Sequence, residues 1–316
     1  MSHYKKFDFK EFVKNLAYSY LPNRKDNPKQ MTVKIVFLAA VVGLIVSACY
    51  LINYLSEAKN QQKLEENARE IWYQESQSPD EPTPFERLLA LNEDFMGWLT
   101  IDNTNVDHPV YQADNNDYYL NHNQEKSVSG YGALYYDFRS VITENYEDQN
   151  LVIYGHNMKN GSMFGKLKLF RDANYYDTDH TITLTTVNGE KKYVVFSTFL
   201  LNAVRADDNN YIFDIYKTTF ASDEEFNDWI AEAKDRSLVD TGIDVFFSDS
   251  ILTFITCCDD FDDARLIVMA REIHQDEMDN LDTSIATENP DPRYPKIWYD
   301  DRKLEYPYKD QNNSEE

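Results

Sequence analysis

An apolar segment near the N-terminus constrains this chain most. Ile35–Ile52 (IVFLAAVVGLIVSACYLI) is 18 residues long and contains no Asp, Glu, Lys or Arg. A helix of roughly 20 such residues spans the hydrocarbon core of a bilayer. The sequence therefore predicts a transmembrane helix over 35–55, with a short basic segment before it and a large polar region after it.

Charge is distributed unevenly on the two sides of this segment. Residues 1–55 contain eight Lys or Arg against three Asp or Glu, whereas the whole chain has a net charge of −24. Because basic residues collect on the cytoplasmic side of membrane spans, we expect a single-pass protein of the cell membrane, with 1–34 in the cytoplasm and the rest outside. The acidic remainder argues against a nucleic-acid partner, since phosphate binding needs a basic surface.

Two alternatives to an uncleaved anchor stay open. The apolar run has the composition of a signal peptide, although the 34-residue leader is long and no A-x-A site follows it. Val46–Cys49 (VSAC) also resembles a bacterial lipoprotein cleavage box, although apolar residues continue beyond Cys49. We favour the uncleaved anchor.

The polar region divides into three parts by composition. Residues 56–84 combine a segment rich in helix formers, interpreted as a helical stalk, with a linker that contains three prolines, Ser78–Pro84 (SPDEPTP). A globular domain is predicted over 85–273. The C-terminal extension, 274–316, is acidic but also aromatic, so we expect it to pack either on the domain or on a partner. Its aromatic residues include Tyr294, Trp298, Tyr299, Tyr306 and Tyr308.

Strand patterns dominate the globular domain. β-branched and aromatic runs predict strands at 151–154, 181–187, 191–200, 244–247, 251–257 and 266–270, and Asn188-Gly189 predicts a hairpin turn. One helix is indicated by a capping box of Ser222 and Glu225, followed by apolar residues at helical spacing. Many strands with few helices predict a mainly antiparallel barrel or sandwich.

Cysteine usage indicates chemistry in this domain. The chain has three cysteines, Cys49 in the apolar run and the adjacent pair Cys257 and Cys258. Cys257 ends an apolar strand, a rigid place to mount a nucleophile, whereas Cys258 would point to the opposite face. A buried structural cysteine is the competing interpretation. A catalytic thiolate also needs a base or cation nearby and a donor for the oxyanion.

Two residues qualify as partners of Cys257. His156 follows a short apolar strand, a context suited to presenting its ring, whereas His108 and His122 are interpreted as loop histidines. Arg265 opens a strand eight residues after Cys257, so a hairpin would place it beside the cysteine as an oxyanion donor. The alternatives for Arg265 are a surface ion pair with the acidic loop before it, or replacement in this role by Arg271.

These segments resemble a known family. Thr253–Cys257 (TFITC) resembles the TLxTC signature of sortases, with Phe254 in place of Leu, and Asn150–Gly165 (NLVIYGHNMKNGSMFG) is similar to the histidine motif of class B sortases. Phe95–Leu99 (FMGWL), His108–Gln112 (HPVYQ) and Asp114–Leu120 (DNNDYYL) are similar to further class B segments. The match covers roughly residues 90–272 in order.

The resemblance implies a mainly β fold, an eight-stranded sortase β-barrel with peripheral helices, preceded by the transmembrane helix. It also implies transpeptidation without a cofactor. Cys257 would form a thioester with a C-terminal sorting signal of the LPxTG or NPxTx kind, His156 would act as acid and base, and Arg265 would stabilise the oxyanion. The amine acceptor would come from a cell-wall peptide precursor or a pilin lysine. Implied substrate-binding residues are Asn116, Leu120, Tyr154, Tyr211, Ile212 and Thr256.

Two positions depart from the class B pattern, Ile255 where Ser is frequent and Cys258 where a polar or acidic residue is frequent. Both bear on substrate preference. Two other classes of function are weighed against the sortase: a hydrolytic cysteine protease, and a membrane-tethered binding protein in which Cys257 is part of the core.

Overall fold

The computed structural model describes residues 8, 10, 18–178, 180–205, 211–278 and 280–308. The chain forms two compact units, Met1–Asn60 and Gln61–Glu316. Helix α2 (Pro28–Tyr73) contains the whole predicted membrane span. Among the described residues it is the one helix long and apolar enough to cross a membrane, and none of its most apolar window is buried. This helix could therefore be a membrane anchor.

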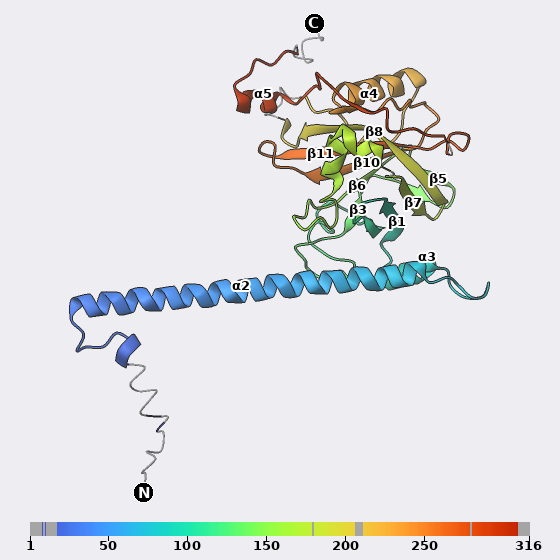
Figure 1. Ribbon diagram of the computed structural model, residues 1–316. Helices are drawn as coiled ribbons and strands as arrows, with labels where there is room; N and C mark the ends of the chain where they lie inside the picture. Colours follow the sequence, from blue (N-terminus) through green and yellow to red (C-terminus); the bar gives the residue numbers. More distant parts are fainter. Residues whose placement is uncertain are drawn as a thin grey trace. The chain divides into compact units, whose positions relative to one another are not determined.

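Eight strands of the second unit close into a barrel, which confirms the predicted fold (Figure 1). Their order around the barrel is β1-β2-β3-β6-β10-β11-β8-β7. The strands are β1 (Phe95–Ile101), β2 (Asp107–Tyr111), β3 (Leu134–Tyr136), β6 (Asn150–Tyr154), β7 (Ile182–Thr186), β8 (Gly189–Asn202), β10 (Ile251–Cys257) and β11 (Ala264–Glu272). Because the barrel is closed, each of these eight strands has two partners.

Most neighbouring strands run antiparallel, but two pairs are parallel, β2 with β3 and β6 with β10. The carboxyl ends of parallel strands lie at one edge of a sheet. The segment after Tyr154 and the end of β10 at Cys257 therefore meet at the same end of the barrel.

Helix α4 (Asp223–Asp235) covers the outer face of this part of the barrel (Figure 1). Ser222 caps it, accepting a hydrogen bond from the Glu225 backbone N–H, and the Glu225 carboxylate accepts one from the Ala221 N–H. Its buried residues Phe226 and Trp229 join an apolar cluster with Ile255 of β10 and Ile267 of β11. Residues of β10 with odd numbers therefore face α4, and those with even numbers face the barrel interior.

The end of α2 belongs to the second unit and packs on the barrel. Trp72 stacks on Trp98 of β1 with ring centroids 5.0 Å apart, and Tyr73 donates a hydrogen bond of 2.9 Å to Asp107. Helix α3 (Pro84–Leu91), capped by Thr83 in a full capping box, adds Leu88 to a second apolar cluster, which also contains Trp98. The predicted helical stalk is thus helical to Tyr73, and its last part packs on the barrel.

The remaining elements are short. They are β4 (Ile142–Thr143), β5 (Tyr146–Glu147), β9 (Val239–Asp240), β12 (Thr287–Glu288), α5 (Lys296–Arg302) and the 3-10 helices η1 (Leu167–Arg171) and η2 (Ala173–Asp177). β12 pairs with β9, and the Asn289 side chain donates to the Ser237 carbonyl at 2.7 Å. The C-terminal extension therefore packs back on the domain over these residues.

One predicted strand, 244–247, is wrong. These residues alternate in burial as a strand would, but they pair with no other strand in the described structure. The Asp244 carbonyl instead accepts a hydrogen bond of 2.8 Å from Arg271, and the Asp249 carboxylate accepts one from the Phe246 N–H. The alternation reflects packing under α4 rather than a place in the sheet.

Candidate active site

Cys257 and His156 lie at the same end of the barrel because of the parallel β6–β10 pair. The register pairs Ile255 of β10 with Tyr154 of β6. Cys257 and His156 each follow two residues after this pair. Three further hydrogen bonds join the strand ends. The Gly155 N–H donates to the Ile255 carbonyl at 3.2 Å, the Thr256 hydroxyl to the Gly155 carbonyl at 2.7 Å, and the Asn157 amide to the Cys257 carbonyl at 2.9 Å.

The His156 ring is oriented by a backbone carbonyl. Its Nε2 lies 2.8 Å from the carbonyl oxygen of Leu120, in the loop between β2 and β3. Because that oxygen can only accept, Nε2 carries the hydrogen in a neutral ring and Nδ1 has the lone pair. This hydrogen bond fixes the tautomer and leaves Nδ1 able to take a proton.

Arg265 lies directly beside the cysteine. The antiparallel β10–β11 register pairs Cys257 with Arg265, and paired residues of neighbouring strands project from the same face. Cys257 is exposed and Arg265 partly exposed, and Arg265 Nη1 donates to the Ala264 carbonyl at 3.0 Å. The guanidinium is thus held by backbone rather than by a carboxylate.

The alternatives named from the sequence are placed differently. Arg271 is buried at the far end of β11, where it forms an ion pair with Glu277. The acidic loop after Cys257 pairs with another arginine, Arg171 of η1, whose two nitrogens lie 2.9 and 2.7 Å from Asp260. His108 is not in a loop but buried in β2, and burial lowers the pKa of its ring.

Cys258 faces away from Cys257. It lines a cavity of 250 Å³ with Thr256 and Leu266, on the other side of the sheet. Burial and the neighbouring Asp260 charge raise the pKa of the Cys258 thiol to about 12. Cys258 therefore stays a neutral thiol at physiological pH, whereas nucleophilic attack needs a thiolate.

Several of the predicted binding residues lie on the face of the barrel that carries Cys257. Tyr154 of β6 and Asn116 both donate to the Asp137 carboxylate at 2.9 Å, and their side chains lie 3.4 Å apart. Tyr154 and Ile212 both pack against the apolar cluster of β10 and α4. The structure therefore brings Asn116, Tyr154 and Ile212 to one face.

Other predicted binding residues are held elsewhere by their side chains. The Tyr211 hydroxyl donates to Glu232 of α4 at 2.6 Å, and the Thr256 side chain lies on the same side of the sheet as Cys258. Leu120 is at the site through the carbonyl that orients His156.

A buried amide, Asn150, helps to hold the connection from β8 to α4, which carries Tyr211 and Ile212, on the barrel. Asn150 Nδ2 donates to the Ile215 and Lys217 carbonyls at 3.0 and 2.9 Å, and the Thr253 hydroxyl donates to its Oδ1 at 2.8 Å. Asn150 thus links Ile215 and Lys217 of this connection to β6 and β10. The sequence analysis did not assign a role to the Asn150 or Asp137 side chains. The signal for Asp137 was a charged residue directly after the apolar and aromatic run Leu134–Tyr136.

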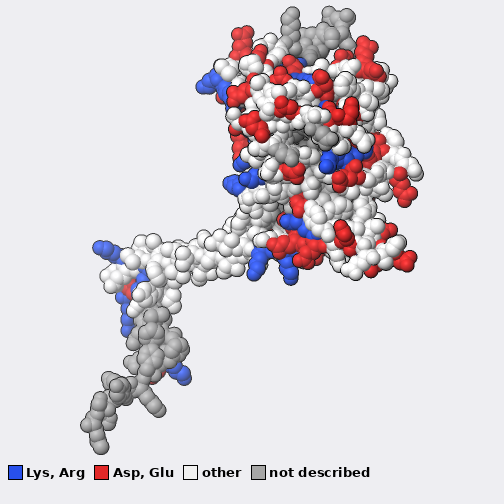
Figure 2. Space-filling model, turned by 45° about the vertical axis from the view of Figure 1, so that its right-hand side comes forward, with Lys and Arg blue, Asp and Glu red and all other residues white. Residues whose placement is uncertain are grey.

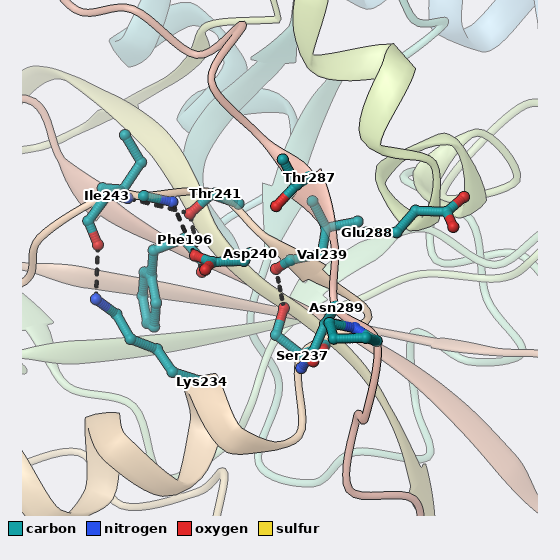
Figure 3. Close-up of a pocket in the computed structure, with 12 residues that line it drawn as sticks. Phe196, Lys234, Ser237, Val239, Asp240, Thr241, Ile243, Thr287, Glu288 and Asn289 are labelled. Carbon is teal, nitrogen blue, oxygen red and sulfur yellow. Dashed lines mark hydrogen bonds between the residues drawn. The ribbon is translucent and has the colours of Figure 1, made fainter.

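A different cavity lies outside this site. Figure 3 shows a space of 290 Å³ lined by Lys234 of α4, Asp240 of β9 and Glu288 of β12. The Lys234 ammonium donates to the Ile243 carbonyl at 2.7 Å (Figure 3), and burial lowers its pKa. No candidate site residue lines this cavity.

Charge on the second unit is mostly acidic. On the face shown in Figure 2, Asp and Glu side chains are scattered over the barrel unit and Lys and Arg side chains lie among them. Such a surface has no strong preference for a polyanionic ligand.

Comparison with known proteins identifies the family. The family model of the sortase domain matches residues 99–273. The chain belongs to the sortase family. Sortase B of Listeria monocytogenes is 28% identical over 247 residues, which cover 74% of this chain and 96% of that protein. Sortase B of Staphylococcus aureus is 27% identical over 247 residues, covering 76% and 96%.

Solved structures agree with these relatives. A mutant form of Clostridium perfringens sortase B has 32% identity and a TM-score of 0.58, covering 67% of this chain and 98% of that one. Sortase B from Bacillus anthracis in complex with AAEK1 has 27% identity and a TM-score of 0.59, covering 70% and 100%. The sortase is therefore of class B, and sortases are cysteine transpeptidases. The family implied by the sequence motifs is confirmed.

Proposed function

We propose that this sortase cleaves a C-terminal sorting signal of the LPxTG or NPxTx kind through a thioester on Cys257. It then transfers the new carboxyl end to the amine of a cell-wall precursor or of a pilin subunit. The observation that carries the proposal is the parallel β6–β10 pair, which brings His156 and Cys257 to one barrel end with Arg265 beside the cysteine.

In the first half of the reaction, the Cys257 sulfur attacks the carbonyl carbon of the signal threonine. The tetrahedral oxyanion receives hydrogen bonds from the Arg265 guanidinium, whose planar set of N–H groups suits a developing negative charge. His156, protonated, gives its proton to the departing amine. The C–N bond breaks and the acyl group remains on sulfur as a thioester.

In the second half, the acceptor amine attacks the thioester carbon. His156 takes a proton from that amine and Arg265 again stabilises the oxyanion. The C–S bond then breaks and returns the Cys257 thiolate, with a new amide joining donor and acceptor.

We infer that the signal binds as an extended peptide in a groove along the barrel face that carries Cys257. Asn116 and Tyr154 offer polar groups on one wall and Ile212 offers apolar surface on the other. Leu120 and Tyr211 flank these, and we assign them to substrate binding as well. Thr256 would act indirectly, because its hydroxyl donates a hydrogen bond to the Gly155 carbonyl and so fixes the backbone next to His156.

The location follows from the charge pattern around α2. With basic residues 1–34 in the cytoplasm, the barrel lies outside the cell, where sorting signals and wall precursors meet. The domain boundaries 1–34, 35–55, 56–84, 85–273 and 274–316 describe this arrangement from cytoplasmic segment to C-terminal extension.

The decisive experiment is mass spectrometry of the full-length protein in detergent after incubation with LPxTG-like and NPxTx-like peptides. We expect an acyl adduct on Cys257 with one motif, and a ligated product when an amine such as triglycine is added. Peptide cleavage that added amine leaves unchanged would indicate a hydrolytic protease. The absence of any adduct across the panel would support a binding protein and reject the proposal.

Gly132 offers a test of His156 orientation. A Cβ at this position would lie 2.5 Å from the Tyr119 carbonyl oxygen, 2.9 Å from the Leu120 carbonyl oxygen and 3.2 Å from the His156 ring, and its φ of +58° disfavours any side chain. We expect Gly132→Ala to lower kcat by about tenfold or more, because the carbonyl that orients the ring must move. Steady-state kinetics with the accepted peptide would measure this.

Gly189→Ala is the matched control. Gly189 also has a positive φ, +103°, but it is the first residue of β8, directly after the β7–β8 turn, with no atom within 4 Å of the added Cβ. We expect that variant to lose stability and keep its kcat. Equal loss of kcat in both variants would mean that strain alone, and not His156 orientation, is responsible.

A further inference from the structure

The Asp137 carboxylate is a buried hub of the groove wall. Its side chain is 2% exposed and follows β3 directly. Arg139 Nε and Nη2 donate to its two oxygens at 2.7 Å each, and Asn116 Nδ2 and the Tyr154 hydroxyl donate to Oδ2 at 2.9 Å each. Donors from two distant segments, and from Arg139 two residues along the chain, thus converge on one carboxylate.

The carboxylate is charged in this setting. Burial alone would raise the pKa of Asp137, but the hydrogen bonds from Arg139, Asn116 and Tyr154 outweigh it and lower the pKa below its ordinary value. Burial, and then the neighbouring Tyr216 and Asp137, raise the pKa of Tyr154, so its hydroxyl remains a donor. Burying such a charge is costly and gives little net stability, so stability alone is a weak explanation for it.

The hub fixes the orientation of two groove residues. The Asn116 side chain is held at both ends, because its Oδ1 also accepts the Phe138 N–H at 3.0 Å. The Tyr154 ring stacks on Tyr135, with centroids 5.0 Å apart and planes 14° apart, while Asp137 fixes its hydroxyl. Neither side chain can rotate without leaving a hydrogen bond to a buried charge unmade.

The same carboxylate reaches the opposite wall through Arg139. The guanidinium that chelates Asp137 lies 4.3 Å from the centre of the Tyr216 ring, in the β8–α4 connection. Such a cation–π contact is favourable at a partly exposed site. Asp137 therefore ties together Asn116 and Tyr154 on one wall and, through Arg139, Tyr216 on the other.

The hub lies close to the nucleophile but does not contact it. Tyr154 pairs with Ile255, two residues before Cys257 on the same face. Tyr154 in turn stacks on Tyr135 of β3, with ring centroids 5.0 Å apart. The residues that the hub holds therefore lie beside the strand end that carries the thiol.

We propose that Asp137 is a positioning residue for the sorting signal: its carboxylate holds Asn116, Tyr154 and Arg139 in the geometry that binds the peptide. This rests on the proposed function, since it assumes that the groove binds that peptide. The role is in binding rather than in chemistry, so Asp137 acts on KM and not on the reactivity of Cys257.

The test is Asp137→Asn in the full-length protein, with the peptide that acylates the wild type. An amide keeps the size of the side chain but loses the charge and turns one acceptor into a donor. We expect KM for the signal peptide to rise about tenfold or more, as for loss of charge-assisted hydrogen bonds, with kcat within about threefold of wild type. The rate of Cys257 alkylation by iodoacetamide should not change.

Asp148→Asn is the matched control. Asp148 is also a buried carboxylate, but it accepts hydrogen bonds from the Val141 N–H and the Tyr146 hydroxyl, both at 2.9 Å, outside the groove. We expect it to change thermal stability and leave KM unchanged. If Asp137→Asn shifts the unfolding temperature as Asp148→Asn does and keeps the wild-type KM, Asp137 is only structural and the inference is overturned.

A double-mutant cycle separates direct from indirect action. If Asp137 works partly through Tyr154, the KM effects of Asp137→Asn and Tyr154→Phe should be less than additive. If Asp137→Asn does not fold, Arg139→Lys replaces it in the test. Lysine keeps the positive charge but loses the paired hydrogen bonds to Asp137. A wild-type KM in Arg139→Lys would overturn the inference. Failure of the wild type to form a thioester would instead reject the proposed function.

Discussion

Cys257→Ala is expected to abolish transpeptidation, whereas Cys258→Ala keeps most of it. Removing a catalytic nucleophile lowers the rate by a factor on the order of 10⁴ or more, because no covalent intermediate can form. Cys258 has the wrong position and the wrong protonation state for that role. It lies across the sheet from Cys257, and a thiol pKa of about 12 leaves almost no thiolate near neutral pH.

Two measurements check this expectation. Mass spectrometry after peptide incubation should show the acyl adduct in wild type and in Cys258→Ala, and none in Cys257→Ala. Iodoacetamide at near-neutral pH should modify Cys257 before Cys258. Circular dichroism and thermal unfolding of Cys257→Ala should match wild type, since its side chain is exposed. A loss of activity in Cys258→Ala as complete as in Cys257→Ala would show that both thiols are needed.

The barrel was predictable because its strands carry their own signals. The run 251–257 and the β7–β8 hairpin are set by local residue types, and the structure has both, although the turn residues are Val187 and Asn188 rather than Asn188 and Gly189. Residues 244–247 show the limit of that reasoning. Their alternation is real, but the backbone groups of a strand need a partner, and the Arg271 side chain takes the Asp244 carbonyl instead.

The candidate site was proposed from motifs rather than from periodicity. The two strands that carry Cys257 and His156 are about 100 residues apart, and no local pattern shows that they pair in parallel. Asp137 was missed for a related reason. Its importance depends on donors 17 and 21 residues away, Tyr154 and Asn116, so only the folded chain shows that a single carboxylate gathers them.

Arg265→Ala is expected to lower kcat by about 10²- to 10³-fold with a smaller change in KM. That is the usual cost of removing one donor to an oxyanion, since the donor acts mainly on the charge that develops in the transition state. Arg265→Lys should recover only part of the rate, because lysine keeps the charge but not the planar set of donors. Single-turnover rates of thioester formation measure this step without interference from the acceptor.

Arg271→Ala is the control on the same strand. Arg271 is buried and donates to the Asp244 and Glu272 carbonyls and to the Glu277 carboxylate. Removing it leaves the buried Asp249 carboxylate, 3.9 Å from Arg271 Nε, without this cation, and we expect a cost of about 3–5 kcal/mol in the free energy of unfolding. Arg265 is partly exposed, and its hydrogen bond is to the neighbouring Ala264 carbonyl, so its loss should hardly change stability.

The two arginine variants thus distinguish a loss of catalysis from a loss of stability on the same strand, β11. Arg265→Ala should unfold at the wild-type temperature and fail in acylation, whereas Arg271→Ala should unfold early and acylate normally while folded. If Arg265→Ala acylates at the wild-type rate, the oxyanion must be stabilised by another group. Backbone N–H groups near Cys257 would then be the donors to examine. The Cys258 N–H could serve only after its hydrogen bond of 3.2 Å to the Ala264 carbonyl is broken.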